Sequence, residues 1–432
     1  MVIYEPTIFI AVFLVILTFA VPRKYFLVPY VVAACFVPTD QRIIIMGLDF
    51  TILRILVVAG VLRILLYGEQ KLIKWNKLDM TILLWVFCSA SVYVIQWMNT
   101  RAIINRFGVI FDVVGLYWLF RQKIRSWNDV KFVFTLLAIA VVILVPLVAL
   151  EWSTGRNPFV ILGRVMTDVR SERYRCQAAF PHSIMLGLFW ATLVPLFVGL
   201  GITQEKKVLY WIAVAAAVFI TMASASSTPI LVLAIVLVGL LWFRWRQLTS
   251  KTGLFLLALL TVLHIVMRAP VWHLLARINV IGASTGWHRY NLIDKAIEHF
   301  GEWVFIGCRT TDHWGFGLGD LTNQYILEGV RGGFITLLIF LAMIYRVLKT
   351  LLNLSIQEKD SKEQFLIWCF FTMIIGHCAA FLGVSYFGQI TMLWYMMLAI
   401  AGLLTEYKCF LENITDTPVS ANLSLAGARY YR

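Results

Sequence analysis

Thirteen apolar runs, separated by short polar segments, constrain this chain more than any other feature of its sequence. Most of them are long enough to cross the roughly 30 Å hydrocarbon layer of a membrane as α-helices. They lie near residues 7–21, 25–38, 43–66, 79–98, 107–120, 131–150, 183–202, 207–223, 228–243, 253–268, 323–348, 365–384 and 386–406. The runs at 25–38 and 107–120 are shorter than the ~17 residues that a span usually needs. We therefore expect an all-α fold, a polytopic transmembrane helix bundle of 12 or 13 spans.

The composition excludes a soluble protein. Hydrophobic residues make up 61% of the chain and charged residues 14%, against roughly 45–50% and about 25% in an ordinary soluble domain. We therefore treat residues 1–432 as a single integral membrane domain.

The basic residues predict which side of the membrane each connection occupies. When the connections are assigned to alternate sides, one side holds 21 of the 37 Lys and Arg residues. By the positive-inside rule this side is cytoplasmic, and it includes the C-terminal tail, 407–432. The longest external segments are then an Arg-rich loop at 151–182 and a large polar segment at 269–322.

The two sides differ in the type of basic residue as well as in number. The cytoplasmic set has 13 Lys and 8 Arg, whereas the external set has 12 Arg and a single lysine, Lys295. A guanidinium group binds phosphate and carboxylate bidentately, whereas an ammonium group is a hydrated point charge that suffices for topology. The bias indicates either Arg–carboxylate pairs within the external loops or a binding site for an anion, and we favour the anion site.

The segment 269–322 combines an amphipathic stretch with a glycine-rich one. Apolar residues recur at helical spacing over 286–305, which predicts a helix lying on the membrane surface. The run 307–319 then breaks the helix, and the chain returns to the membrane at Asp320.

A charge within an apolar run is costly unless it is paired or faces a hydrated cavity, and two pairs of such residues are informative here. Glu328 and Arg331 are three residues apart and share a helix face, so they either pair with each other or belong to a functional site. Arg54 and Asp112 are the other two, and we expect them to pair and hold the bundle together.

Several other features favour structural roles. The turn 224–229 (SASSTP) can cap a helix or bind a sugar or diphosphate, and capping is favoured. Gly332 and Gly333 are expected to permit close helix packing. The seven cysteines are interpreted as small hydrophobes, with a Cys176–Cys308 disulfide as the less favoured alternative. The chain has no metal-ligand spacing, P-loop or GxSxG motif, and its positive charge follows topology, so no metal, cofactor or nucleic-acid partner is expected.

The order of these features resembles the O-antigen ligase and O-antigen polymerase superfamily, bacterial inner-membrane glycosyltransferases of the C-type fold. The resemblance covers roughly residues 170–345. The family's segment before a central span is matched by Arg175, Ala178, Phe180, His182 and Gly187. Its Ser-rich turn, its arginine on an external amphipathic helix and its Gly-x-Gly-like stretch are matched by Ser226 to Pro229, by Arg289 and by Gly307-Cys308.

One position departs from the family pattern. Family members re-enter the membrane at a His-Asn pair followed by paired small residues; Asn323 and Gly333 keep this pattern, but Thr322 stands where the ligases have His. In ligases this His is taken to activate the acceptor hydroxyl. The base would here be Asp320, His313 or Glu328, unless the enzyme works without one, and the absent His favours a polymerase over a ligase.

The resemblance implies an activity that suits external arginines. Members transfer a glycan from undecaprenyl diphosphate to an acceptor hydroxyl on the periplasmic side, without metal or nucleotide, so 269–322 would be periplasmic. Arginines would stabilise the diphosphate leaving group, and a general base is typically worth 10²–10⁴-fold. The implied partners are a polyprenyl-diphosphate-linked glycan, an acceptor glycan and membrane lipids.

These considerations assign the candidate site. The catalytic candidates are Asp320, Arg289 and Glu328, and the substrate-binding candidates are Arg173, Arg175, His182, Arg309, His313, Thr322, Asn323 and Tyr325. The main alternative is a transporter or flippase of a lipid-linked or anionic solute. It would favour internal repeats with polar residues at mid-membrane depth, whereas the polar residues here gather at one face.

Overall fold

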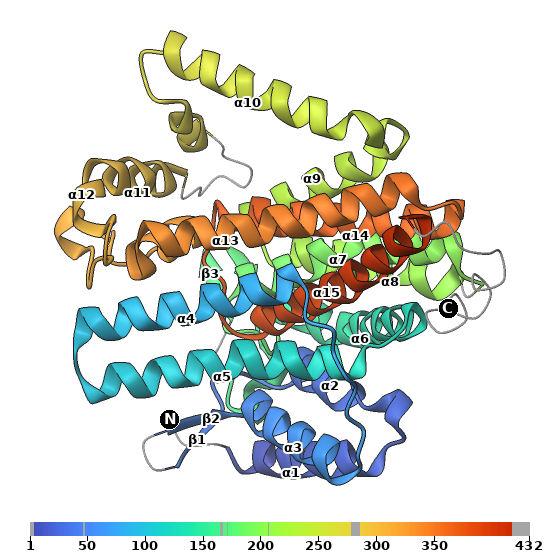
Figure 1. Cartoon of the computed structure of the whole chain (residues 1–432). Helices are drawn as coiled ribbons and strands as arrows, with labels where there is room; N and C mark the ends of the chain where they lie inside the picture. The colour runs from blue at the N-terminus through green and yellow to red at the C-terminus, as the bar shows by residue number, and fades with distance from the viewer. Residues whose placement is uncertain are drawn as a thin grey trace.

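The computed structural model describes residues 4–45, 48–164, 167–170, 172–205, 207–277 and 286–416. Within these residues the chain is almost entirely helical (Figure 1). The α-helices are α1 (Glu5–Ala20), α2 (Val28–Phe36), α3 (Ile52–Leu66), α4 (Lys77–Trp97), α5 (Thr100–Lys123), α6 (Trp127–Thr154), α7 (Ser183–Thr203), α8 (Lys207–Ala223), α9 (Ser227–Leu241), α10 (Thr249–Val266), α11 (Gly286–Glu298), α12 (Phe300–Trp303), α13 (Gln324–Gln357), α14 (Ser361–Phe381) and α15 (Gln389–Asp416).

Short 3-10 helices and two small hairpins complete the described secondary structure. The 3-10 helices are η1 (Arg23–Tyr25), η2 (Pro158–Leu162), η3 (Trp242–Leu248), η4 (Val271–Arg277) and η5 (Asp312–Trp314). Strand β1 (Arg42–Ile45) pairs antiparallel with β2 (Leu48–Thr51), and β3 (Asp168–Arg170) pairs antiparallel with β4 (Arg173–Arg175).

The predicted all-α fold is confirmed, and the lengths and composition of its helices are consistent with a multi-pass membrane protein. In the described part of the chain, eight helical segments are long and apolar enough to cross a membrane, and α1 and α8 are shorter apolar helices. Each of the thirteen apolar runs contains an α-helix. One of the eight segments, Ser227–Val266, joins α9, η3 and α10.

Two of the runs differ from the expected spans. The run at 43–66 begins as the β1–β2 hairpin, so its helix α3 is 15 residues long. Helix α2 has nine residues and therefore a length of only about 14 Å, too little to cross a layer of roughly 30 Å. The short run at 107–120, in contrast, lies inside the 24-residue helix α5, because polar residues at both ends of that helix conceal its length.

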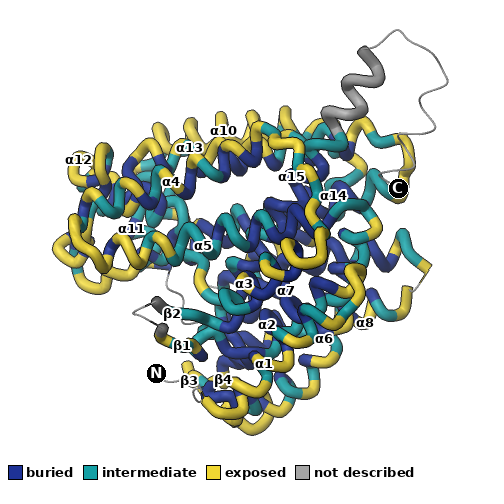
Figure 2. Tube along the Cα trace, turned by 60° about the horizontal axis from the view of Figure 1, so that its bottom comes forward, coloured by how far each residue is buried: buried dark blue, intermediate teal, exposed yellow. Residues whose placement is uncertain are grey.

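Helix α7 is the centre of the bundle, and most of its residues are buried (Figure 2). It packs against α8, α9 and α14. Gly187 lies where α7 meets the turn between α8 and α9, and a Cβ there would lie 2.5 Å from Ser224 Oγ and 2.7 Å from Pro229 Cγ. The glycine therefore lets the end of the central helix approach the Ser-rich turn closely.

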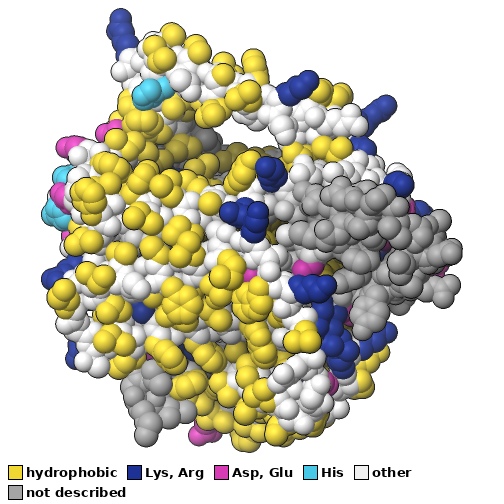
Figure 3. Space-filling model, viewed as in Figure 1, with side chains coloured by type: hydrophobic (Ala, Val, Ile, Leu, Met, Phe, Trp, Pro, Cys, Tyr) yellow, Lys and Arg dark blue, Asp and Glu magenta, His cyan; other side chains and the backbone are white. Residues whose placement is uncertain are grey.

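The exterior is apolar where a bilayer would surround it. Hydrophobic side chains are spread over the face seen in Figure 3, between scattered Lys and Arg. Helix α10 lies apart from the bundle at the top of Figure 1 and has no buried residue. Its long apolar side chains, such as Phe255 at 65% exposure, suit contact with lipid tails.

The two ends of the bundle differ in what they hold. Helices α11 and α12, the β1–β2 hairpin and the α4–α5 connection lie together at the left of Figure 1. We call this the α11 end. Helix α5 starts at this end, and at about 1.5 Å per residue its 24 residues extend about 36 Å. Its last residue, Lys123, therefore marks the opposite end, which we call the Lys123 end.

The amphipathic stretch is helical as predicted, but its apolar face does not lie free on a membrane surface. Leu292 and Ala296 of α11 are buried in a small core with Trp303, Leu318 and Val330. Protein contacts therefore cover part of the face that the sequence assigned to lipid, and they attach α11 to the first turns of α13.

The paired glycines in α13 also act differently from the prediction. Gly333 has φ 76°, which kinks α13, and a Cβ there would lie 2.5 Å from Phe305 O. The adjacent amide of Phe334 donates to Val304 O at 2.9 Å. Here the glycine makes room for the backbone that follows α12, not for a second transmembrane helix.

Candidate functional site

The β3–β4 hairpin, with three residues in each strand, positions Arg175. In the antiparallel register Asp168 lies opposite Arg175, and the Arg175 guanidinium binds Asp168 Oδ2 at 2.9 Å and donates to Ser226 Oγ at 3.0 Å. The backbone amide of Cys176 donates to Ala223 O at 3.2 Å, which attaches the hairpin to the α8–α9 turn. Arg175 is buried, whereas the side chain of Asp168 is 47% exposed.

Arg289 reaches the same turn from α11. Its guanidinium donates to Thr228 Oγ1 at 2.7 Å and to Gly383 O at 3.1 Å. The first contact is with the first turn of α9, and the second is with the connection after α14. Two arginines that are far apart in sequence therefore bind hydroxyls two residues apart, on Ser226 and Thr228.

The N-terminus of α9 adds to this positive charge. The expected capping by the Ser-rich turn is wrong for Ser226, because this N-cap residue makes no side-chain cap hydrogen bond. Its hydroxyl donates instead to Ser224 O at 2.9 Å and accepts from Arg175. The first amide groups of a helix have a partial positive charge, so an anion near Ser226 and Thr228 would meet two guanidinium groups and a helix N-terminus.

Burial and mutual repulsion both act on these arginines. Burial lowers the pKa of Arg289, and the nearby charge of Arg170 lowers it further. Burial also lowers the pKa of Arg175, with Asp168 acting in the opposite direction. An arginine keeps its proton in a protein, so both guanidinium groups remain charged in spite of their burial.

A buried scaffold holds the loop before α7. The Glu151 carboxylate at the end of α6 accepts from the amides of Gln177 and Ala178, each at 2.9 Å. Arg164 binds Asp40 at 2.5 Å and donates to Pro181 O at 2.7 Å. Arg164 therefore forms an Arg–carboxylate pair within the external loops. The sequence analysis had given such pairing as the alternative to an anion site for all of the external arginines.

His182 is the N-cap of α7, and its Nδ1 accepts from the amide of Ile184 at 3.1 Å. Burial lowers the pKa of His182, and the charge of Arg175 lowers it further. The carboxylates of Asp168 and Asp320 act on the same imidazole in the opposite direction. The charges of the hairpin and of the exposed Asp320, which precedes α13, therefore both act on His182.

The residues after Asp320 contact α14 and the connection that follows it, which Arg289 also binds. Asn323 caps α13 with its Oδ1 and donates from Nδ2 to Leu382 O at 3.1 Å, next to the carbonyl that Arg289 binds. The Tyr325 hydroxyl donates to Cys378 O at 3.0 Å. The hydroxyl of Thr322 is shielded from solvent and has no hydrogen-bond partner among the described residues.

Other predicted residues have different surroundings. Arg173 is exposed on the β3–β4 hairpin. Arg309 donates to Gln96 O at 2.6 Å and lies over the ring of Trp97, against the α4–α5 connection. His313 binds Glu302 at 2.8 Å, beside α12.

Glu328 is buried within α13, and a direct Glu328–Arg331 pair is wrong. Its carboxylate accepts from Trp85 Nε1 at 2.8 Å and from Gln324 Nε2 at 2.7 Å. These neutral donors come from α4 and from the preceding turn of its own helix.

The expected pair between Arg54 and Asp112 is confirmed. Arg54 Nε donates to Asp112 Oδ1 at 2.7 Å and a terminal guanidinium nitrogen binds Oδ2 at 2.6 Å. This bidentate contact joins α3 to α5. The predicted disulfide alternative is not formed, since Cys176 and Cys308 are both free.

The sequence analysis missed Asp168, Arg170 and Thr228 as members of the site. Asp168 and Arg175 are seven residues apart, and a signal for their pairing exists in the polar hairpin pattern 167–175. Thr228 was considered only as part of a capping turn. Its contact with Arg289 depends on the fold, which brings the Arg289 side chain of α11 to the start of α9, and leaves no trace in local sequence.

A second basic region lies at the Lys123 end. A cavity of about 520 Å³ is lined there by Arg23, Lys24, Lys71, Lys123 and Arg125, with Asp129 at its edge. Most of these residues come from the connections before α2, after α3 and after α5. An anion could be attracted to this cavity as well, so binding experiments must distinguish the two ends.

The chain matches no protein-family model, no curated protein and no solved structure. The superfamily resemblance therefore remains a prediction from the order of the motifs. The geometry of the site has to support any function by itself.

Proposed function

We propose that this protein is a glycosyltransferase that polymerises, or ligates, saccharides carried on undecaprenyl diphosphate, at the periplasmic face of a bacterial inner membrane. The product would be a surface polysaccharide of the O-antigen or exopolysaccharide type. No step of the proposal uses a metal or a nucleotide.

One observation is the main support for this function. Arg175 and Arg289 come from separate elements and bind Ser226 and Thr228, at the N-terminus of α9. Among the described residues, the hydrogen-bond partners of the Arg289 guanidinium are neutral. A diphosphate exchanging with these weak partners would gain charge-assisted, bidentate hydrogen bonds.

The chemistry follows from where charge develops. As the glycosidic carbon–oxygen bond breaks, negative charge grows on the departing diphosphate. Arg175, Arg289 and the α9 N-terminus would stabilise that charge in place, and such preorganised groups act more strongly in the transition state than in the ground state.

The acceptor would approach from the start of α13. Asp320 is exposed, directly precedes α13, and acts electrostatically on His182, and these features favour it as the general base. Glu328 and His313 are weaker candidates because their side chains bind Trp85 and Glu302. Thr322 offers an unpartnered hydroxyl, which suits a contact with a sugar, and its identity favours a polymerase over a ligase.

The transporter alternative has one observation in its favour, the basic cavity at the Lys123 end. A flippase would need a polar route between the two basic regions. The central helix α7 is instead packed with buried apolar side chains, which favours a reaction at one end over transport from one end to the other.

The test is native mass spectrometry of the detergent-purified full chain, comparing wild type with Arg289→Ala. We expect a co-purified polyisoprenyl phosphate or diphosphate in the wild type and its loss in the variant. Arg23→Ala, which changes the cavity at the Lys123 end, is the matched control and should keep the lipid. Ordinary phospholipids in equal amounts in all three proteins would contradict the proposal.

A further inference from the structure

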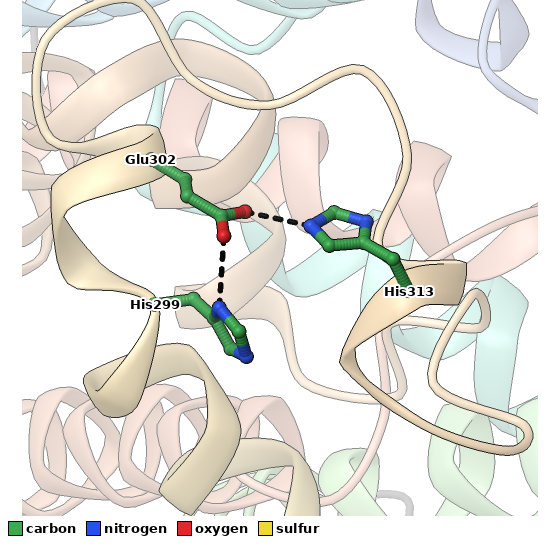
Figure 4. A group of neighbouring side chains, drawn as sticks. All are labelled: His299, Glu302 and His313. Atoms are coloured by element: carbon green, nitrogen blue, oxygen red, sulfur yellow. Dashed lines mark hydrogen bonds and ion pairs between the residues drawn. The ribbon is translucent and has the colours of Figure 1, made fainter.

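A second cluster of reactive side chains lies near the far end of α11. His299 follows this helix, Glu302 belongs to α12, and His313 belongs to η5 (Figure 4). His299 comes ten residues after Arg289, which corresponds to about 15 Å along a helix at 1.5 Å per residue. The cluster is therefore separate from the arginines of the candidate functional site.

The three side chains converge on the carboxylate of Glu302. His299 Nδ1 lies 2.8 Å from Oε1, and His313 Nε2 lies 2.8 Å from Oε2. The two imidazole nitrogens and the carboxylate lie within 4.8 Å of one another. Figure 4 shows a nitrogen of each ring directed at the carboxylate, with one ring on each of its two oxygens.

One tryptophan orients two of these three groups. Trp314 Nε1 donates to Glu302 Oε2 at 3.0 Å, and its ring stacks on His299 with centroids 5.3 Å apart and an interplanar angle of 4°. Trp314 itself is buried in the core that contains Leu292 and Val330. Its hydrogen bond and its stacked ring therefore hold Glu302 and His299 in place.

We propose that His299, Glu302 and His313 form a binding site for a divalent transition metal, with zinc as the best fit. Two imidazoles and one carboxylate are the donor set of many zinc sites with three protein ligands. Outer hydrogen bonds that fix the ligands, as Trp314 does for Glu302, are usual around such metals.

The bound metal would leave a coordination position open to solvent. The His313 and Glu302 side chains are 51% and 38% exposed, so water can occupy the fourth position of a tetrahedral site. The metal would also link η5 to α12, across the glycine-rich run that precedes α13. This inference does not depend on the proposed transferase function, which uses other residues.

The experiment measures zinc on the full-length protein, purified in detergent after removal of any affinity tag. Protein treated with a chelator is equilibrated with zinc, desalted and analysed by inductively coupled plasma mass spectrometry. We expect stoichiometric zinc on the wild type and nearly complete loss in Glu302→Gln and His313→Ala. His313 is exposed in a short 3-10 helix, so its replacement should leave the fold intact, which gel filtration checks.

Two control variants sharpen the result. Cys308→Ser changes a thiol on the connection between α12 and η5, and His288→Ala changes a histidine of α11; both should retain zinc. Cobalt substitution provides a spectroscopic readout, because a site of nitrogen and oxygen ligands lacks a thiolate charge-transfer band. Wild type that binds no more zinc than Glu302→Gln, or loss of zinc in Cys308→Ser, would overturn the proposal.

Discussion

The basic residues at the two ends of the bundle have different partners. At the Lys123 end, Glu69 binds both Arg63 and Lys123, and all three are largely buried. Arg121 in turn lies between the carboxylates of Asp79 and Glu406.

At the α11 end some basic residues have carboxylate partners, as Arg54 has Asp112 and Arg164 has Asp40, but two arginines are held by neutral groups. In the part of the chain that the structure describes, Arg289 binds a hydroxyl and a carbonyl, and Arg309 binds a carbonyl. Arg175 has one carboxylate partner, the half-exposed Asp168.

This difference distinguishes the cations that are neutralised by a partner from those that can still bind an anion. A buried cation with a carboxylate partner is neutralised and serves the fold, and breaking such a pair is costly because one charge is left alone. A cation held by neutral groups keeps its field and can attract an anion. Proteins usually prefer the first arrangement for buried charges, so the second one marks a site.

The largest expected effect tests the structural end. Glu69→Gln removes one carboxylate from two buried cations, and we expect a loss of about 3–5 kcal/mol in the free energy of unfolding. Thermal unfolding of the detergent-solubilised protein measures it. Adding Lys123→Met should recover part of the loss by removing one of the unpaired charges. The contrast between the two ends would fail if Glu69→Gln left the melting temperature unchanged.

The second effect tests the site end. Arg289→Ala should lower turnover of a polyprenyl-diphosphate-linked saccharide by about 10²–10³-fold, with little change in melting temperature. Product chains formed in proteoliposomes measure the turnover. Arg289→Lys should retain an intermediate activity, and Arg309→Ala, at a site with different neighbours, should stay close to the wild type. An Arg289→Ala variant with more than half of the wild-type activity would remove this residue from the site.

The third effect is smaller and concerns the geometry of Arg175. Arg175→Lys keeps the positive charge but loses the planar guanidinium group, whose two terminal nitrogens bind Asp168 and Ser226 at the same time. We expect inhibition by inorganic diphosphate to weaken about tenfold, or roughly 1.4 kcal/mol. Arg173→Lys, on the exposed side of the same hairpin, is the matched control. Equal weakening in both variants would mean that the affinity for diphosphate does not depend on the guanidinium geometry of Arg175 in particular.

Much of the architecture could be predicted because hydrocarbon imposes simple rules. Long apolar runs must be helical, and Arg54 needs a partner at its depth, which Asp112 provides. The partner of a buried charge is harder to predict where neutral polar side chains can take the place of an opposite charge. For this reason Glu328 binds Trp85 from a helix more than 200 residues away in sequence, instead of Arg331.

The site was predictable in its residue types and not in its contacts. The external bias towards arginine pointed to Arg175 and Arg289, but Thr228 and Gly383 became partners only because the fold brings the Arg289 side chain to the start of α9 and to the connection after α14. Likewise, the absence of metal-ligand spacing concealed the convergence of His299, Glu302 and His313, because their contact depends on the turn between α12 and η5.

The smallest expected effect is a pH dependence at the α11 end. Burial and Arg175 hold the pKa of His182 below its ordinary value of about 6.5, so the imidazole is neutral in the folded protein at pH 7. A depressed pKa stabilises the fold above the unfolded pKa, and this contribution is lost as the pH falls through the folded pKa. Protonation would also prevent Nδ1 from accepting the Ile184 amide.

The comparison is between wild type and His182→Asn from pH 8 to pH 5. Asparagine is a good N-cap and does not titrate in this range, so the variant should keep the cap and lose less melting temperature on acidification. The difference should be modest, because Asp168 and Asp320 favour the charged imidazole and oppose Arg175. Parallel curves for the two proteins would show that His182 stays neutral throughout, and that the positive field of the arginines is stronger than the two carboxylates.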